Sequence, residues 1–141
     1  MTFNTPQVLI IDDDPGVLFL HEIIVKEGAL NRDPSTFLNA EKALDYIIPI
    51  DASTTKILIF LDINMPRING WEFLEILVEK IKHADIKVVM VTSSLSKSEF
   101  EKSKEYEFII DFWQKPMEEE QVYLLKENLG SWLGEHLANE N

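Results

Sequence analysis

The sequence predicts an α/β fold in which five helices cover a doubly wound, parallel sheet of five strands. Short β-branched runs alternate with longer segments of helical period along almost the whole chain, with steps of roughly 22 to 29 residues, enough for strand, loop and crossover helix. Three runs, VLII, ILIFL and IKVVMV, are nearly continuously apolar, as expected of parallel strands covered on both faces. The weaker run STFL is expected at an edge. The strands begin near Gln7, Ser35, Ile57, Ile86 and Phe108.

The first two helices have clear start signals. Asp14 followed by Pro15 provides an N-cap with proline in the first turn, and Gly28 ends this helix. Asn39 caps the second helix. The apolar residues predicted to share one face are Val17, Leu20 and Ile24 in the first helix, and Ala43, Ile47 and Tyr46 in the second.

The remaining helices begin with acidic first turns. Asn69 with Glu72, and Ser96 with Glu99, have the spacing of reciprocal capping pairs. The fifth helix begins after Pro116, and its first turn complements the helix dipole with Glu118, Glu119 and Glu120. Its apolar series predicts a continuation beyond Gly130 to about Leu137. We expect one domain over residues 1–141, with a core at about 7–129.

The composition of the chain limits the partners and metal ligands that it can have. The 141 residues include 25 Asp and Glu against 13 Lys and Arg, a formal charge of −12, so direct binding to nucleic acid or an anionic membrane is disfavoured. The chain has no cysteine and three scattered histidines, which leaves oxygen ligands for any metal. The first apolar run, VLII, is too short for a signal peptide or a membrane span. A cytoplasmic location is expected.

Polar side chains stand at the carboxyl ends of four predicted strands. Asp12 and Asp13 follow VLII, Asp62 follows ILIFL, Thr92 follows IKVVMV, and Lys115 follows the fifth strand. Open α/β sheets bind ligands at this edge. The sequence therefore predicts that three carboxylates, a hydroxyl and an ammonium meet in one crevice.

The predicted carboxylates need compensation. At about 4 to 6 Å, each close pair would repel by roughly 4 kcal/mol at an effective dielectric near 20. Proton uptake with raised pKa values is one answer, and a hard divalent cation such as Mg²⁺ is the other. With a cation bound, Asp62 could act as a carboxylate nucleophile towards a phosphoryl group, whose oxygens Lys115 and Thr92 could bind.

Four segments together resemble the receiver domain of bacterial two-component response regulators. In order, they are VLIIDDDP, ILIFLDINMPRING, KVVMVTSS and FWQKP, and the match extends from Gln7 to about Leu129. The resemblance implies the flavodoxin-like fold of receiver type, with strand order 2-1-3-4-5. It also implies phosphorelay signalling.

The resemblance assigns the chemistry to named positions. Asp62 would be the phosphoacceptor, taking its phosphoryl group from a histidine kinase or a histidine phosphotransfer protein. Mg²⁺ would be bound by Asp62, by Asp13 directly, by Asp12 largely through water, and by the backbone carbonyl of Asn64. The protein would not be an enzyme in the usual sense, since it would catalyse only its own phosphorylation and dephosphorylation.

Further positions are implied to couple the site to the surface. Thr92 would move towards the phosphoryl oxygens and Phe112 would change rotamer, while Lys115 pairs with the phosphoryl group. Asn64 and Ser94 would tune hydrolysis. The bond between Lys115 and Pro116 would be cis. The output is expected on the surface formed by the fourth helix, fifth strand and fifth helix.

Some features depart from the family pattern. Phe112 replaces the commoner tyrosine and lacks its hydroxyl, and Ser93 stands where alanine is more usual. Only 26 residues follow Lys115, so a stand-alone receiver is expected, with an unknown downstream protein as its partner and homodimerisation as an option.

Two other functions are carried as alternatives. A phosphorylation-independent scaffold or binding module on the same fold is the first. An aspartyl-phosphate phosphatase is disfavoured, because it needs a carboxylate two residues after the nucleophile, where this chain has Asn64. The tryptophans are expected to pack in the core or at interfaces, and the histidines to be ordinary surface or helix residues without a role: Trp71, Trp113, Trp132, His21, His83 and His136.

Overall fold

The strands form one parallel sheet in the order β2-β1-β3-β4-β5 in the computed structural model, which describes residues 5–93 and 96–134. They are β1 (Gln7–Ile11), β2 (Ser35–Phe37), β3 (Lys56–Leu61), β4 (Asp85–Thr92) and β5 (Ile109–Gln114). Each begins within one residue of its predicted position, and the short β2 lies at an edge, as predicted. The register places Ile11 beside Leu61, and Leu61 beside Met90, so the central strands end side by side.

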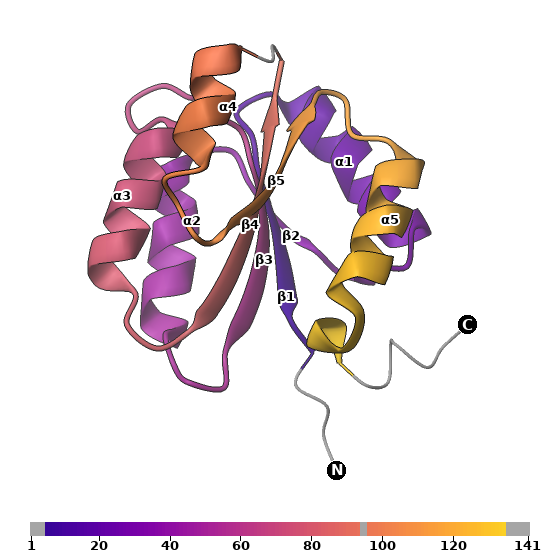
Figure 1. Ribbon diagram of the computed structural model, residues 1–141, viewed down its shortest axis with the longest axis horizontal. Helices are drawn as coiled ribbons and strands as arrows, with labels where there is room; N and C mark the ends of the chain where they lie inside the picture. Colours follow the sequence, from indigo (N-terminus) through magenta and orange to yellow (C-terminus); the bar gives the residue numbers. More distant parts are fainter. Residues whose placement is uncertain (1–4, 94–95, 135–141) are drawn as a thin grey trace.

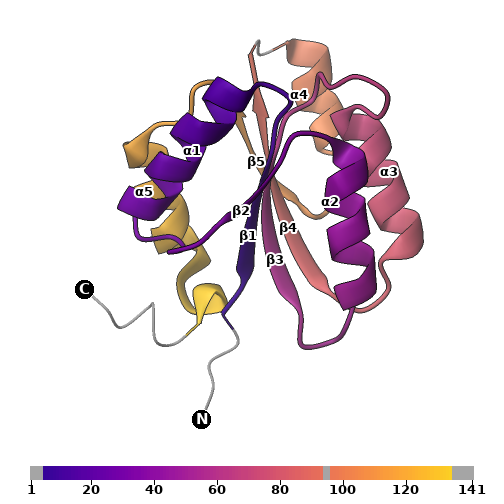
Figure 2. The same ribbon diagram turned by 180° about the vertical axis from the view of Figure 1, so that it is seen from behind.

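Five α-helices cover the two faces of the sheet. They are α1 (Pro15–Glu27), α2 (Ala40–Ile47), α3 (Gly70–Lys80), α4 (Lys97–Ser103) and α5 (Glu119–Leu129). α1 and α5 cover one face, whereas α2, α3 and α4 lie on the other (Figure 1; seen from behind in Figure 2). Short 3₁₀ helices follow α2 (η1, Ile48–Ile50) and α5 (η2, Gly130–Leu133). No described helix is long and apolar enough to cross a membrane.

Alternate residues of the central strands enter two apolar cores. In β1, Leu9 and Ile11 belong to the cluster under α2 and α3, whereas Val8 and Ile10 belong to the cluster under α1 and α5. This follows from the two-residue period of a strand. Burial on both faces explains why the central strands read as continuous apolar runs.

Four of the five described α-helices begin at the predicted caps. A side-chain oxygen accepts a hydrogen bond from a first-turn backbone amide at Asp14, Asn39, Asn69 and Ser96. Asn69 and Glu72 form both halves of a capping box. These bonds fix the chain entering each helix, and Asp14 in particular fixes the turn that carries the acidic residues after β1.

The structure corrects predictions about three helices. In α2, Ala43 and Ile47 are buried as predicted, but Tyr46, predicted to share their face, is 37% exposed. The buried face of α1 consists of Leu18, His21, Ile24 and Val25, whereas Leu20 is 41% exposed. Apolar residues occur almost all around this helix, so their period does not select one face. In addition, α5 ends at Leu129, because Gly130 adopts a left-handed φ of 49° and the chain continues as η2. Leu137, to which the helix was expected to extend, lies outside the described residues.

Candidate functional site

Three carboxylates meet at the carboxyl edge of the sheet. Asp12 and Asp13 follow β1, and Asp62 follows β3. The backbone amide of Asp62 donates to the carbonyl of Ile11 at 3.0 Å, which aligns the two strand ends. One carboxylate oxygen from each aspartate lies within 4.8 Å of the other two. Asp12 and Asp62 are buried, whereas Asp13 is exposed.

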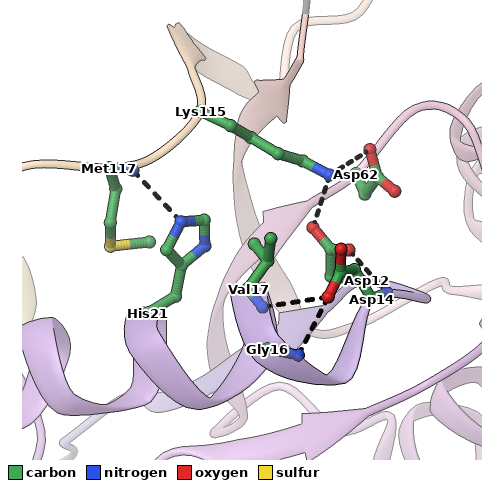
Figure 3. Close-up of polar contacts among 8 residues, drawn as sticks. All are labelled: Asp12, Asp14, Gly16, Val17, His21, Asp62, Lys115 and Met117. Carbon is green, nitrogen blue, oxygen red and sulfur yellow. Dashed lines mark hydrogen bonds and ion pairs between the residues drawn. The ribbon is translucent and has the colours of Figure 1, made fainter.

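Lys115 places one ammonium between the two buried carboxylates. Its Nζ lies 2.8 Å from Oδ2 of Asp12 and 3.1 Å from Oδ1 of Asp62 (Figure 3). Its backbone amide donates to the carbonyl of Thr92 at 2.7 Å, which ties this segment to the end of β4. The peptide bond to Pro116 is cis, as the resemblance implies. The structure therefore brings together the strand ends that the sequence singled out.

Crowding perturbs the acid–base properties of the site. Burial raises the pKa of Asp12, although Lys115 and the amide of Asp14 act in the opposite direction. Burial, followed by the charge of Asp12, raises the pKa of Asp62 to about 6 despite the opposing effect of Lys115. Burial lowers the pKa of Lys115, but its two carboxylate partners outweigh this and raise it overall. One ammonium is thus too little positive charge for this cluster.

The donor set fits a hard divalent cation. Three carboxylates in an oxygen-only site are ligands that Mg²⁺ prefers, and a second positive charge would relieve the crowding at Asp62. The site opens into a pocket of about 560 Å³. For comparison, one water molecule takes up about 30 Å³ in the liquid. The volume of this pocket is large enough for a hydrated ion and a phosphoryl group. The pocket lining consists of Asp13, Asp14, Pro15, Asp62, Asn64, Ser93 and Lys115.

Thr92 contributes a hydroxyl that lacks a partner. The residue is fully buried at the end of β4, and its Oγ1 has no hydrogen-bond partner within the described part of the chain. A buried hydroxyl without a partner costs free energy, so this group would gain from an acceptor brought within its reach. Thr92 itself does not line the pocket beside the carboxylates, although its neighbour does. Ser93 and Asn64 line the same pocket. Ser94, expected to tune hydrolysis, lies outside the described residues.

Gly70 supports Asp62 from behind, which the sequence did not reveal. Its amide donates to the carbonyl of Ile63 at 2.7 Å, and a Cβ at this position would lie 2.6 Å from the carbonyl oxygen of Asp62. Only glycine permits this approach. The glycine in MPRING was the available signal, although by itself it also suits the start of a helix.

Aromatic contacts connect α4 to its neighbours. Phe112 on β5 is half-buried and packs edge-on against Phe100 of α4, with ring centroids 5.9 Å apart. Trp71 of α3 donates from Nε1 to Glu99 at 3.5 Å, and Lys102 lies over its ring at 4.8 Å from the centroid. A change in the rotamer of Phe112 would therefore alter its contact with α4.

The predictions for the tryptophans and histidines can be compared with their burial in the structure. Trp71 and Trp113 are buried and Trp132 packs against the core, which confirms the packing prediction. His83 is exposed, as expected, and His136 lies outside the described residues. His21 lies on a helix, as one form of the prediction had it, but it is only 1% exposed and accepts a hydrogen bond from a distant backbone amide.

Comparison with known families decides the identity of this site. A family model described as the response regulator receiver domain matches residues 8–125. The chain belongs to this family. Receiver domains act in two-component systems, generally with histidine kinases or phosphotransfer proteins as partners, and generally bind Mg²⁺ at an acidic cluster, for which Asp12, Asp13 and Asp62 form a candidate site.

Individual relatives agree with this assignment. A transcriptional regulatory protein, CitT, of Halalkalibacterium halodurans is 31% identical over 117 residues, which cover 83% of this chain and 49% of that protein. The chain thus spans about half the length of this curated relative. The crystal structure of a receiver protein from Dyadobacter fermentans is 27% identical, with a TM-score of 0.75 and coverage of 91% and 98%. A response regulator from Cytophaga hutchinsonii supports the fold alone, at 24% identity, a TM-score of 0.71 and coverage of 88% and 98%.

Proposed function

We propose that this receiver domain is phosphorylated on Asp62 by a histidine kinase or a histidine phosphotransfer protein, and that it signals through phosphorylation-dependent binding to another protein in the cytoplasm. The observation that carries this proposal is the pairing of one Lys115 ammonium with both Asp12 and Asp62 at an open pocket. The protein acts on its own aspartate and on no separate substrate.

Asp62 supplies the nucleophile. One of its carboxylate oxygens attacks the phosphorus of the donor, forming an acyl phosphate while the bond from phosphorus to the donor imidazole breaks. The departing imidazole takes the electron pair of that bond, and a proton from solvent completes the neutral ring. The raised pKa of Asp62, about 6, still leaves the carboxylate ionised at neutral pH and makes it more basic than an exposed aspartate.

The acidic cluster would hold the metal. Asp12, Asp13 and Asp62, with the backbone carbonyl of Asn64, are the proposed protein ligands of Mg²⁺. When bound, Mg²⁺ supplies positive charge that lets a phosphoryl group approach the carboxylates. Asp13, the exposed member of the cluster, is the carboxylate most open to an ion from solvent.

Lys115 and Thr92 stabilise the transferred group. The ammonium of Lys115 lies 3.1 Å from an oxygen of Asp62, so it is within reach of a phosphoryl oxygen on that carboxylate. The unpartnered hydroxyl of Thr92 donates to a second oxygen. Asn64 and Ser94 tune how fast water reaches the acyl phosphate.

The output surface is proposed to be the α4–β5–α5 face. Four large apolar side chains are exposed on these elements, each by 38% or more: Phe100, Ile110, Tyr123 and Leu124. Movement of Thr92 towards the phosphoryl group frees space for Phe112, which contacts Phe100. The apolar side chains give a downstream protein or a second copy of this chain a surface to bind.

Labelling with a small donor tests the phosphorylation. We expect phosphoramidate or acetyl phosphate with Mg²⁺ to add one phosphoryl group, detected by mass spectrometry, and Asp62→Asn to abolish it. Asp45→Asn, which changes an exposed aspartate on α2 in the same way, should leave labelling intact. Persistent labelling of the Asp62 variant would reject the assignment.

Binding of beryllofluoride, which mimics the phosphoryl group, tests the output. Amide signals of α4, β5 and α5 are expected to shift, and a captured partner should prefer the loaded form. A partner that binds equally well to the native protein, to Asp62→Asn and to the loaded form would favour the scaffold instead.

A further inference from the structure

His21 is a buried polar residue that the proposed chemistry does not use. It is 1% exposed and lies on the buried face of α1 with Leu18 and Val25, two members of the apolar cluster under α1 and α5. A buried imidazole in such surroundings is costly unless a partner satisfies it. The identity of that partner links His21 to the site.

The partner is the backbone amide of Met117. This amide donates to Nε2 of His21 at 3.1 Å, and the bond joins residues 96 positions apart (Figure 3). Met117 is itself only 1% exposed, so its amide has no access to water as an alternative acceptor. The bond fastens the segment between β5 and α5 to the middle of α1.

Only two backbone amides are available in residues 115–117, because Pro116 has none. The amide of Lys115 donates to the carbonyl of Thr92 at 2.7 Å, and the amide of Met117 donates to His21. One attachment is therefore to the end of β4 and the other to α1. The same helix α1 begins at the turn of Asp12 to Asp14, so His21 fixes Lys115 relative to the carboxylates that its ammonium contacts.

The imidazole is suited to accept this bond at neutral pH. Burial, and then the charge of Lys115, lowers the pKa of His21 to about 4. At neutral pH the ring is uncharged, and the acceptance of a hydrogen bond at Nε2 places its single proton on Nδ1.

We propose that His21 is a positioning residue for phosphoryl transfer: through the amide of Met117 it holds the segment after β5 against α1, so that the Lys115 ammonium remains beside Asp12 and Asp62. This inference rests on the proposed function of Asp62. It assigns no contact between His21 and the phosphoryl group.

Three variants separate positioning from packing. His21→Leu removes the acceptor but keeps an apolar side chain of similar volume, His21→Gln keeps an acceptor of similar reach, and His83→Leu makes the same change at an exposed site. With saturating Mg²⁺ and phosphoramidate, well below the melting temperature, we expect His21→Leu to be phosphorylated at least fivefold more slowly than the native protein. His21→Gln and His83→Leu should remain within twofold of native.

Hydrogen exchange gives a readout that does not depend on phosphorylation. In His21→Leu, the amide of Met117 should exchange at least tenfold faster relative to the amide of Ile59 in the central strand β3, whereas a general loss of stability would accelerate both. A native rate of phosphorylation in His21→Leu, equal losses in the Leu and Gln variants, or unchanged exchange at Met117 would each overturn the proposal. If the native protein itself is not phosphorylated, the proposed function fails first, and the exchange result still shows whether the contact exists.

Discussion

Acidic side chains lie at both ends of the parallel strands, which form the carboxyl and amino edges of the sheet, but their pKa values are shifted in opposite directions. At the carboxyl edge, Asp12 and Asp62 are buried, share the single ammonium of Lys115 and have raised pKa values. At the amino edge, Asp51 accepts hydrogen bonds from three successive backbone amides, those of residues 82, 83 and 84, at 2.7 to 2.9 Å. These bonds, that from Lys82 first, lower the pKa of Asp51.

The amino edge is also closed by aromatic contacts. Trp132 of η2 donates from Nε1 to Asp85 at 2.7 Å. The ammonium groups of Lys56 and Lys87 lie 5.3 and 5.1 Å from the centre of its ring. Asp51 and Asp85 thus each accept hydrogen bonds from donors that the chain itself supplies, and these contacts stabilise the fold.

The difference between the two edges shows why one acidic edge is a candidate cation-binding site and the other is not. Carboxylates that accept hydrogen bonds from donors of the chain stabilise the fold, whereas carboxylates with too few donors favour the binding of a cation from solvent. Such a cluster lowers the stability of the free protein in return for binding capacity.

The largest effect is expected from Mg²⁺. At a concentration one hundred times its dissociation constant, a ligand of the folded state raises the free energy of unfolding by about 2.7 kcal/mol. Urea denaturation with and without Mg²⁺ should show this gain in the native protein and lose it in Asp13→Asn. Asp51→Asn should lower the stability in both buffers but keep the gain. A gain that disappears equally in both variants would break the contrast between the edges.

The second largest effect on stability is expected from removing the ammonium of Lys115. In EDTA, Lys115→Met should lower the free energy of unfolding by about 2 kcal/mol, because two buried carboxylates lose their partner. Lys26→Met, which removes an exposed ammonium paired with Glu22, should cost less than about 0.5 kcal/mol. Chemical denaturation near neutral pH measures both. Equal costs would mean that the buried pair is worth no more than a surface pair.

Lowering the pH should break the hydrogen bond between the amide of Met117 and His21. The pKa of His21 is lowered in the folded state, so the unfolded chain binds the proton more readily, and stability is lost as the pH falls from 6.5 towards about 4. Between pH 7 and 5 we expect a loss of about 1 kcal/mol that His21→Gln lacks, after allowance for solvent screening. Parallel profiles for the two proteins would contradict a neutral, buried His21.

The smallest effect is expected at the amino edge. Trp132→Phe retains most of the ring packing but removes the hydrogen bond to Asp85, so it should lower stability by about 0.5 to 1 kcal/mol. Labelling of Asp62 should be unchanged, since the two edges lie at opposite ends of the strands. A slower labelling rate would show that the edges are coupled.

The sequence could predict the acidic edge because strand ends in an α/β sheet lie together. Asp12, Asp62 and Lys115 each follow an apolar run, and parallel order alone brings these positions to one edge. The start of α1 was equally accessible, because the cap at Asp14 uses neighbouring residues.

Other features depend on contacts that no local pattern records. The role of His21 needs the position of Met117, which lies 96 residues further along the chain. The buried face of α1 could not be chosen, because Leu20 and Leu18 are equally apolar and only packing against β1 and α5 separates them. The end of α5 at Gly130 was obscured by apolar residues that continue into η2.

The contacts of Trp71 have a practical consequence for spectroscopy. Its indole is buried on α3 yet touches α4 through Glu99 and Lys102, whereas Trp132 lies at the far edge of the sheet. A change in the emission of Trp71 would therefore report displacement of α4 without an attached dye. With Trp113 and Trp132 replaced by phenylalanine, Trp71 would be the sole indole of the chain, and the timing of α4 movement could be followed in a stopped-flow instrument.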